Sequence, residues 1–182
     1  MGNVTNHEAV IESALQEANE KVFKPKAIQV KLLKECAFAI PTLVDWLYGD
    51  WQTYDVTLTK ERLVSGLEAQ LANDGMPFTL VALKGEVPIG MISLKREGPT
   101  ELADFPGPWP GSFHVIPEER PRRIGWHLAT LIFTIARGLG HKQLNFYTSN
   151  PRNVTRYTKL GARVLETRPF RGHTITIMSL KL

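Results

Sequence analysis

The chain has 182 residues, 43% of them hydrophobic, and a formal net charge of +4. This length and composition fit a single globular domain with a sizeable core, and they exclude a disordered chain. The charge favours an anionic small molecule as partner and is too small to indicate a nucleic-acid-binding protein.

The cysteine and histidine content argues against a disulfide or a metal centre. Cys36 is the only cysteine, and the five histidines show no metal-ligand spacing. The sequence has no signal peptide, no myristoylation pattern and no apolar run near the roughly 20 residues that span a membrane. We therefore expect a cytoplasmic protein without a metal and without a membrane partner.

The first segment of the chain predicts a helix. Residues 7–21 are rich in Ala, Leu, Glu and Lys, and Pro25 would end the helix. We interpret residues 1–26 as an N-terminal helical extension and residues 27–182 as a single domain. Three interpretations of the extension stay open: an appended arm, an expression-related segment or a partner-binding segment.

A strand and two helices are predicted next. Alternating apolar residues predict a strand over residues 27–33, and a helix follows over residues 40–51. A second helix is predicted over residues 59–75, with Thr59 as its N-cap and Gly75 as its C-cap.

The middle of the chain predicts a hairpin, a loop, a strand and a long helix. Residues 78–97 predict a hairpin that turns at Lys84 and Gly85. The proline-rich segment 97–111 is expected to be a loop, and residues 112–116 the next strand. The helix is predicted because apolar residues recur at helical spacing. They are Ile124, Leu128, Leu131, Ile132, Ile135 and Leu139.

The last third of the chain predicts a strand, a short helix and a closing hairpin. Residues 143–148 predict the strand, and residues 150–161 a turn and the helix. Residues 162–182 predict a hairpin around Arg171 and Gly172.

The order of these elements predicts the fold class. We expect an α/β fold with a mixed, mostly antiparallel sheet of about seven strands and helices on both faces. The strand–helix–strand unit at residues 112–148 is expected to be a central, right-handed parallel crossover.

The turn that follows Ile116 is the first candidate site. A ligand is expected where a strand feeds a helix, and the free N–H groups of a helix start attract phosphate. Arg120, Arg122 and Arg123 add positive charge, but Gly125 is the only glycine of the turn. These residues alone leave open whether the turn is an anion site or a solvated basic surface.

Residues 112–128, SFHVIPEERPRRIGWHL, resemble the acyl-CoA motif of the GNAT superfamily of N-acetyltransferases. In that family a strand ending in Val-x-Pro leads into Arg/Gln-x-x-Gly-x-Gly/Ala and a helix. The matching positions are Val115, Pro117, Arg120 and Gly125. Pro121 and Arg123 depart from the motif, because they stand where the family commonly has glycine.

Residues 150–166, NPRNVTRYTKLGARVLE, are similar to the family's Asn that is followed seven positions later by Tyr-x-x-Leu-Gly. Residues 80–94, 107–113 and 170–182 are similar to further strands and hairpins of the family. The resemblance covers residues 27–182 as a whole. It implies the GNAT fold, acetyl-CoA as cosubstrate, and an acceptor amine that attacks the thioester directly.

The resemblance also implies positions for coenzyme A. Its pyrophosphate would lie on backbone N–H groups of the turn, which comprises Arg122, Arg123, Ile124, Gly125 and Trp126. The pantetheine arm would run beside the strand near His114 and Val115, and the N–H of Val115 would help to polarise the thioester carbonyl.

Tyr157 would protonate the departing thiolate, although a packed helix aromatic is the other interpretation. Asn150 would bond the pantetheine or cap the short helix. His114 is the candidate general base, because an imidazole takes up a proton near neutrality; the sheet could also turn it to the other face. Glu118 and Glu119 are further candidates, or they cover the arginines of the turn.

Three tryptophans have two interpretations. Each would either line an acceptor cleft together with the proline-rich loop or pack in the core. They are Trp46, Trp51 and Trp109.

The two departures from the motif have different costs. If a glycine donates at position 121, Pro121 loses a charge-assisted bond of about 1.5–3 kcal/mol; in a first helical turn, proline fits well. If position 123 needs a positive φ, Arg123 costs about 1–2 kcal/mol, whereas its guanidinium could bind phosphate and offset this cost. We hypothesise a retained coenzyme A site in which arginine side chains replace part of the backbone cradle.

Three functions were weighed on these grounds. The first is an acyl-CoA-dependent N-acyltransferase that acts on a small-molecule amine, a peptide N-terminus or a lysine. The second is a non-catalytic binding or regulatory module with the same fold and a weakened coenzyme A site. Nucleic-acid binding through the RPRR run is the least favoured, because the run is short and has no aromatic platform. A homodimer is left open.

Overall fold

The computed structural model describes residues 6–182, which form two antiparallel sheets. The first sheet has the order β1-β2-β3-β4, with β1 (Gln29–Leu32), β2 (Phe78–Lys84), β3 (Val87–Lys95) and β4 (Trp109–Val115). The second has the order β5-β7-β6, with β5 (Gln143–Thr148), β6 (Arg163–Phe170) and β7 (His173–Lys181). The α-helices are α1 (His7–Ala18), α2 (Ile40–Trp51), α3 (Lys60–Glu68), α4 (Ile124–Gly138) and α5 (Pro151–Thr158).

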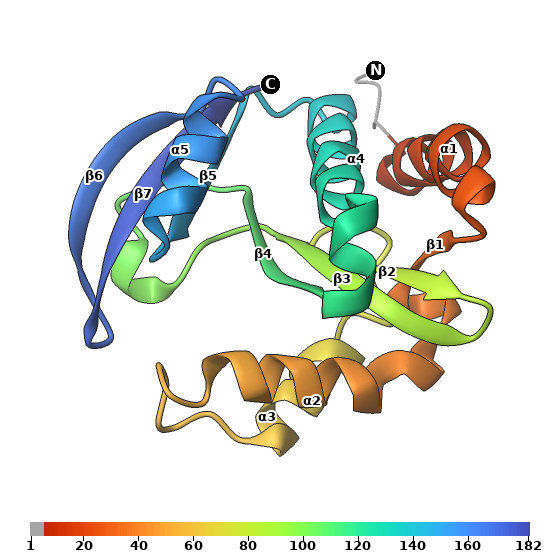
Figure 1. The fold of residues 1–182 in the computed structure, drawn as a ribbon, viewed down its shortest axis with the longest axis horizontal. Coiled ribbons are helices and arrows are strands. Elements are labelled where there is room, and N and C mark those ends of the chain that lie inside the picture. The colour runs from red at the N-terminus through yellow and green to blue at the C-terminus, as the bar shows by residue number, and fades with distance from the viewer. Residues whose placement is uncertain (1–5) are drawn as a thin grey trace.

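Helices cover both faces of the first sheet, as the sequence predicts (Figure 1). Successive residues of a strand point to opposite faces of the sheet. Because helices cover both faces, residues 80–83 of β2 are all apolar. Leu80 and Ala82 pack in the core with α1 and α4, whereas Val81 and Leu83 pack in the core with α2 and α3. The strand sequence therefore supplies two cores at once.

The expectation of one continuous sheet needs a correction, because the seven strands are divided between two sheets. Among the described residues, β4 and β5 form no ladder; one backbone hydrogen bond, from Asn145 N–H to Pro108 C=O at 3.2 Å, joins them near their starts. A register shift between β3 and β4, with Ser112 at a φ of 48°, interrupts β4. Such bulges bend a strand, which accounts for the parting of β4 from β5.

Two element boundaries also differ from the sequence-based expectation. Helix α3 is capped by Thr59 as predicted but ends at Glu68, well before Gly75. Beyond Glu68 the backbone closes short turns, and the side chain of Asn73 donates to the carbonyl of Pro77 instead of facing solvent. Strand β4 starts at Trp109, inside the segment that was expected to be a loop.

The N-terminal segment packs into the core of the domain. The side chain of Asn19 donates to the carbonyl of Val30 at 2.8 Å and accepts from its N–H at 2.7 Å, so it pairs with the outer edge of β1. Ile11, Leu15 and Phe23 are buried against the first sheet and α4. Residues 7–26 thus contribute to the same core as the rest of the chain.

Replacing Phe23 by Ala tests this packing. The side chain of Phe23 is 0% exposed, so we expect a loss of about 3–5 kcal/mol in the free energy of unfolding. Phe38→Ala is the matched control, because Phe38 is 56% exposed and its loss should change that free energy by less than about 0.5 kcal/mol. Denaturant titration measures both; equal effects would mean that the segment does not dock as described.

Candidate active site

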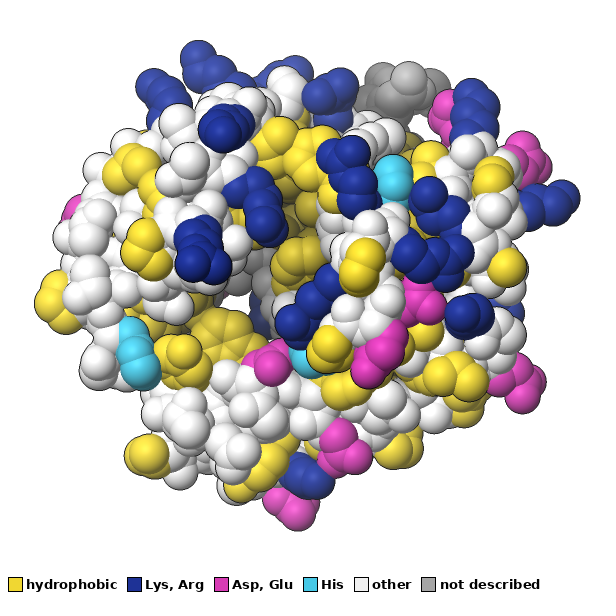
Figure 2. Space-filling model, viewed as in Figure 1, with side chains coloured by type: hydrophobic (Ala, Val, Ile, Leu, Met, Phe, Trp, Pro, Cys, Tyr) yellow, Lys and Arg dark blue, Asp and Glu magenta, His cyan; other side chains and the backbone are white. Residues whose placement is uncertain are grey.

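A cleft of about 660 Å³ opens where β4 and β5 part. Its walls come from these two strands, from α2, α4 and α5, and from the loops before β4 and between β6 and β7. Figure 2 shows it as a hollow with hydrophobic side chains inside, Lys and Arg side chains along its upper rim, and Asp or Glu and His side chains at its lower rim. Such a concave, mostly apolar site with charged groups at its rim suits a large polar ligand.

The turn between β4 and α4, whose Gly125 packs against the cleft residue Phe113, presents unpaired backbone donors. A 3₁₀ helix (Pro117–Arg122) leads into α4, and the N–H groups of Ile124, Gly125 and Trp126 have no acceptor among the described residues. The N–H of Arg123 is already used by the carbonyl of Arg120 at 3.1 Å. Of the five residues from Arg122 to Trp126 that the sequence suggests for phosphate binding, the last three therefore present consecutive free N–H groups at the start of a helix.

Gly125 brings α4 close to β4. A Cβ atom at this position would lie 2.8 Å from Cζ of Phe113 and 3.5 Å from Cγ2 of Val115. A side chain here would require the exposed ring of Phe113 to move, so glycine allows the close approach of α4 to β4.

The three arginines of the turn have different partners. The Nε of Arg120 donates to the carbonyl of Val115 at 3.0 Å. Arg122 donates to Glu119 at 2.7 Å and to the carbonyl of Lys26. The bond from Arg122 to Glu119 lowers the pKa of the Glu119 carboxyl. Glu119 therefore covers an arginine, as one interpretation of the sequence held.

Arg123 lies over the ring of Trp126, 5.7 Å from its centroid, and has no carboxylate partner among the described residues. Its backbone has a φ of 61° and a ψ of 27°, so the left-handed conformation is the case that applies. An arginine in this conformation costs about 1–2 kcal/mol. Pro121 lies inside the 3₁₀ helix, where its fixed φ is compatible with the backbone.

The backbone of Val115 faces the open edge of β4. The N–H of Ile116 donates to the carbonyl of Ile89 in β3 at 3.1 Å. Adjacent residues of a strand point their backbone groups to opposite sides, so the N–H of Val115 points away from β3 and toward the gap. The side chain of Val115 is buried among core residues beside α4.

Tyr157 lines the cleft and also packs in a small core. Its ring meets that of Phe146 edge-on, with centroids 5.0 Å apart. Burial raises the pKa of its hydroxyl, which therefore stays protonated at neutral pH. The two interpretations of Tyr157 are thus compatible: the ring packs, and the hydroxyl is a donor at the cleft.

Asn150 caps α5, because its side-chain oxygen accepts from the N–H of Arg152 at 3.0 Å. Asn153 lines the cleft instead, and its amide donates to the hydroxyl of Thr148 at 3.4 Å. The sequence analysis did not select Asn153, although it lies one helical turn after Asn150.

His114 lies on the side of the sheet that faces α2. Its Nδ1 is 2.7 Å from the carboxylate of Asp50, and its ring stacks on Trp46 with centroids 4.7 Å apart. Asp50 lines the cleft, whereas His114 is not among the lining side chains. The sequence analysis missed Asp50, although Trp46 and Asp50 share one face of α2 at i and i+4.

Aromatic side chains line the end of the cleft that lies farthest from the turn. Trp51 meets Tyr54 at 5.6 Å and Tyr147 at 6.3 Å, and Tyr54 meets His173 at 4.0 Å between centroids. Burial raises the pKa of Tyr147 to about 12. Trp51 and Trp109 line the cleft, as one interpretation predicted, whereas Trp46 covers His114.

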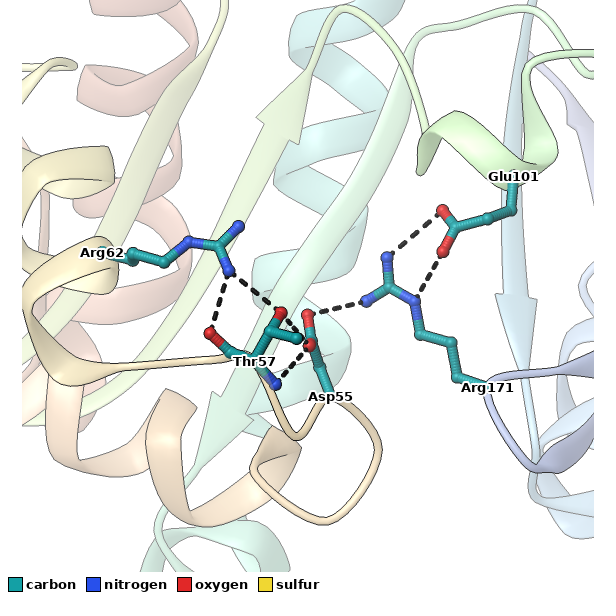
Figure 3. A network of polar contacts seen from close by, with 5 residues as sticks. All are labelled: Asp55, Thr57, Arg62, Glu101 and Arg171. Atoms are coloured by element: carbon teal, nitrogen blue, oxygen red, sulfur yellow. Dashed lines mark hydrogen bonds and ion pairs between the residues drawn. The ribbon is translucent and has the colours of Figure 1, made fainter.

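A polar network joins three segments beside this aromatic end (Figure 3). Arg171, in the turn between β6 and β7, donates to Glu101 at 2.9 Å and to Asp55 at 3.3 Å. Thr57 donates to Asp55 through its N–H and hydroxyl, and it accepts from Arg62 of α3. The network therefore ties the loop after α2, the proline-rich loop and the last hairpin together.

Among residues 6–182, no helix is long and apolar enough to cross a membrane. The same residues contain no group of three or more His, Cys, Asp or Glu side chains placed to hold a metal ion.

Known proteins match the chain in family and in fold. The family model described as "Acetyltransferase (GNAT) family" matches residues 40–162. A GCN5-related N-acetyltransferase from Kribbella flavida has a TM-score of 0.65 at 21% identity, covering 87% of this chain and 99% of that chain. An acetyltransferase from Streptococcus agalactiae 2603 has a TM-score of 0.64 at 17% identity, covering 86% and 99%.

A third solved structure is an aminoglycoside 6'-N-acetyltransferase complexed with coenzyme A, with a TM-score of 0.61 at 13% identity, covering 84% of this chain and 96% of that chain. No curated protein matches the chain. These solved structures are similar to the chain in fold. Their identities of 13–21% are too low to indicate an acceptor substrate.

Replacing Arg171 by Gln tests the network. Without the guanidinium, the loop after α2 and the last hairpin should exchange backbone hydrogens faster, whereas the free energy of unfolding should fall by less than about 1 kcal/mol, because exposed ion pairs are weak. Arg137→Gln, at an exposed position near the end of α4, is the control and should change neither. Unchanged exchange in Arg171→Gln would show that the network does not hold these segments.

The same network should loosen in acid. Bonds from Thr57 lower the pKa of Asp55, and bonds from Arg171 lower that of Glu101. A carboxylate with a lowered pKa contributes stability above its ordinary value, and the contribution disappears as the pH falls through the lowered value. Tryptophan fluorescence should therefore report a local change below about pH 4 that Arg171→Gln lacks. The same change in both proteins would contradict this assignment.

Proposed function

This chain belongs to the acetyltransferase (GNAT) family, and on that premise we propose that it transfers an acetyl group from acetyl-CoA to an amine of a small molecule or peptide. One observation carries the proposal. Three unpaired N–H groups, at Ile124, Gly125 and Trp126, lie beside a cleft whose walls hold Tyr157 and Asp50, because Gly125 packs against Phe113, which lines that cleft. A candidate phosphate site therefore adjoins a cavity that holds an acid and a carboxylate.

We propose that the pyrophosphate of coenzyme A binds these three N–H groups. The start of α4 adds its dipole, and Arg123 adds a guanidinium that no carboxylate of the described residues neutralises. Arg120 and Arg122 support the turn, because their side chains bond to Val115, Glu119 and Lys26. Two residues depart from the family motif, Pro121 and Arg123. Of these, only Arg123 would contribute a phosphate-binding group, its guanidinium, in place of a backbone N–H.

We propose that the pantetheine arm follows the open edge of β4, where the N–H of Val115 is a donor. An extended ligand that adds to a strand edge needs backbone groups more than particular side chains. The amides of Asn150 and Asn153, at the start of α5, are further donors near this path.

The reaction we propose is a direct transfer. The acceptor nitrogen bonds to the carbonyl carbon of the thioester, and the carbon–sulfur bond breaks. The thiolate takes a proton, which a phenol retains at neutral pH, from the hydroxyl of Tyr157. The proton that leaves the amine goes to the Asp50–His114 pair, in which Asp50 faces the cleft and His114 supports it.

Replacing Tyr157 by Phe tests the acid. We expect kcat to fall by about 10²–10⁴-fold, because the proton donor is lost, while binding of coenzyme A stays the same, because the ring still packs on Phe146. Tyr48→Phe is the control, since Tyr48 is not among the residues that line the cleft. Release of thiol from acetyl-CoA measures kcat; a variant as active as the unchanged protein would exclude Tyr157 as the acid.

Two substitutions of Arg123 separate its charge from its backbone strain. Arg123→Gly and Arg123→Asn both accept a positive φ and both lose the guanidinium. We expect each variant to bind coenzyme A at least about tenfold more weakly. We expect the free energy of unfolding of Arg123→Gly to be about 1 kcal/mol higher than that of the unchanged protein, because the strain is relieved. Calorimetry and denaturant titration measure the two effects. Tighter binding in both variants would mean that the native arginine impairs the site.

Turnover distinguishes this function from a non-catalytic module. Thiol release from acetyl-CoA across a panel of amines should exceed the rate without an amine. If coenzyme A binds but no amine accelerates thiol release, the chain is a binding module of the same fold.

A further inference from the structure

A second cavity, of about 360 Å³, adjoins the cleft between α3 and the end of β3. The two cavities share five lining residues: Leu47, Leu63, Lys95, Glu97 and Ser112. The second cavity is therefore a side pocket of the cleft, and Lys95 stands where the two meet.

Lys95 is a cation without a partner. It is the last residue of β3, and its Nζ lies 3.8 Å from where a Cβ atom of Gly111 would be, so it reaches over the start of β4. Among residues 6–182, no hydrogen bond or ion pair is formed by its ammonium group, and Glu97 lies too far away to pair with it. Of the other cations of this region, Arg171 is bonded to Asp55 and Glu101, and Arg62 to Thr57, whereas Arg96 forms no hydrogen bond or ion pair with residues 6–182 either and lines only the side pocket.

The surroundings of Lys95 favour a bound anion. The side chain of Lys95 is exposed where the two cavities meet, while nearby protein atoms lower the pKa of its ammonium by desolvation. A carboxylate in contact with this ammonium would restore the favoured charged form. The side pocket is also lined by Arg62 and Arg96, against Glu97 as its only acid among the lining residues.

The same cleft also carries a negative charge. Asp50 lines it on α2, and Trp51 and Tyr54 supply aromatic surface beside it. An acceptor that places its amine at Asp50 and an anionic group at Lys95 would meet complementary charges at both groups.

We propose that Lys95 binds a carboxylate of the acceptor, so that the acceptor is an amine that also carries a carboxylate, as an amino acid does. This inference rests on the proposed function and adds a substrate class to it. The bond is a charge-assisted one, from the Nζ of Lys95 to a carboxylate oxygen, and it discriminates against amines of the same shape that lack the charge. The aromatic rings at this end fit an acceptor with an aromatic side chain.

Binding of matched ligands tests the proposal without turnover. Calorimetry in the presence of coenzyme A would compare phenylalanine with phenylalaninamide, which keeps the amine, the ring and the size but lacks the carboxylate. We expect phenylalanine to bind about tenfold more tightly or better. In Lys95→Met this preference should disappear, and in Lys95→Arg it should persist. Lys142→Met, at an exposed position after α4, should behave as the unchanged protein.

Three results would overturn the proposal: equal binding of both ligands, no binding of phenylalanine, or a preference that survives in Lys95→Met. Thermal unfolding would verify that Lys95→Met remains folded. If Lys95→Met does not fold, Lys95→Arg still tests the proposal, because the preference for phenylalanine must persist in that variant.

The same ligands in the thiol-release assay separate this proposal from the proposed function. Acetylation of phenylalaninamide and phenethylamine as efficiently as of phenylalanine would keep the acetyltransferase and overturn the role of Lys95. Carboxylate-selective binding that depends on Lys95, without any thiol release, would keep the role of Lys95 and overturn the proposed function.

Discussion

The parting of β4 from β5 is the constraint on which the rest of the structure depends. Two strands that paired along their length would satisfy their backbone groups and close the sheet. Here they share one hydrogen bond near their starts, and then a bulge with Ser112 at positive φ lets β4 leave its neighbour. The unpaired edge stays in contact with a cleft instead of core, and the side chains of α4 and α5 reach that cleft from either side.

In the function that we propose, the turn at the end of β4 makes this gap a site for an anion. Gly125 brings the start of α4 against Phe113 and Val115 of β4, which sets the unpaired N–H groups near the open edge. The left-handed backbone of Arg123 costs about 1–2 kcal/mol, yet it directs the chain from the 3₁₀ helix into α4. A costly conformation kept at a ligand-facing turn fits a functional role for that turn.

Most of the fold follows from local sequence signals, and the site follows only in part. The Thr59 cap and the Arg171–Gly172 turn are local, and the structure confirms both. The end of α3 and the division of the sheet depend on contacts between distant residues, such as Thr79 with Gln70, that no local pattern specifies. Asp50 and Lys95 were missed for the same reason: only the packing of α2 and β3 around one cavity brings them together.

The central claim is that coenzyme A binds with its pyrophosphate on the start of α4 and its arm along β4. Titrating ¹⁵N-labelled protein with coenzyme A, and following the amide signals by NMR, tests this directly. We predict that the largest shifts occur at Ile124, Gly125 and Trp126, followed by Val115. Saturable binding that leaves these four amides unchanged, or no binding at millimolar coenzyme A, would contradict it.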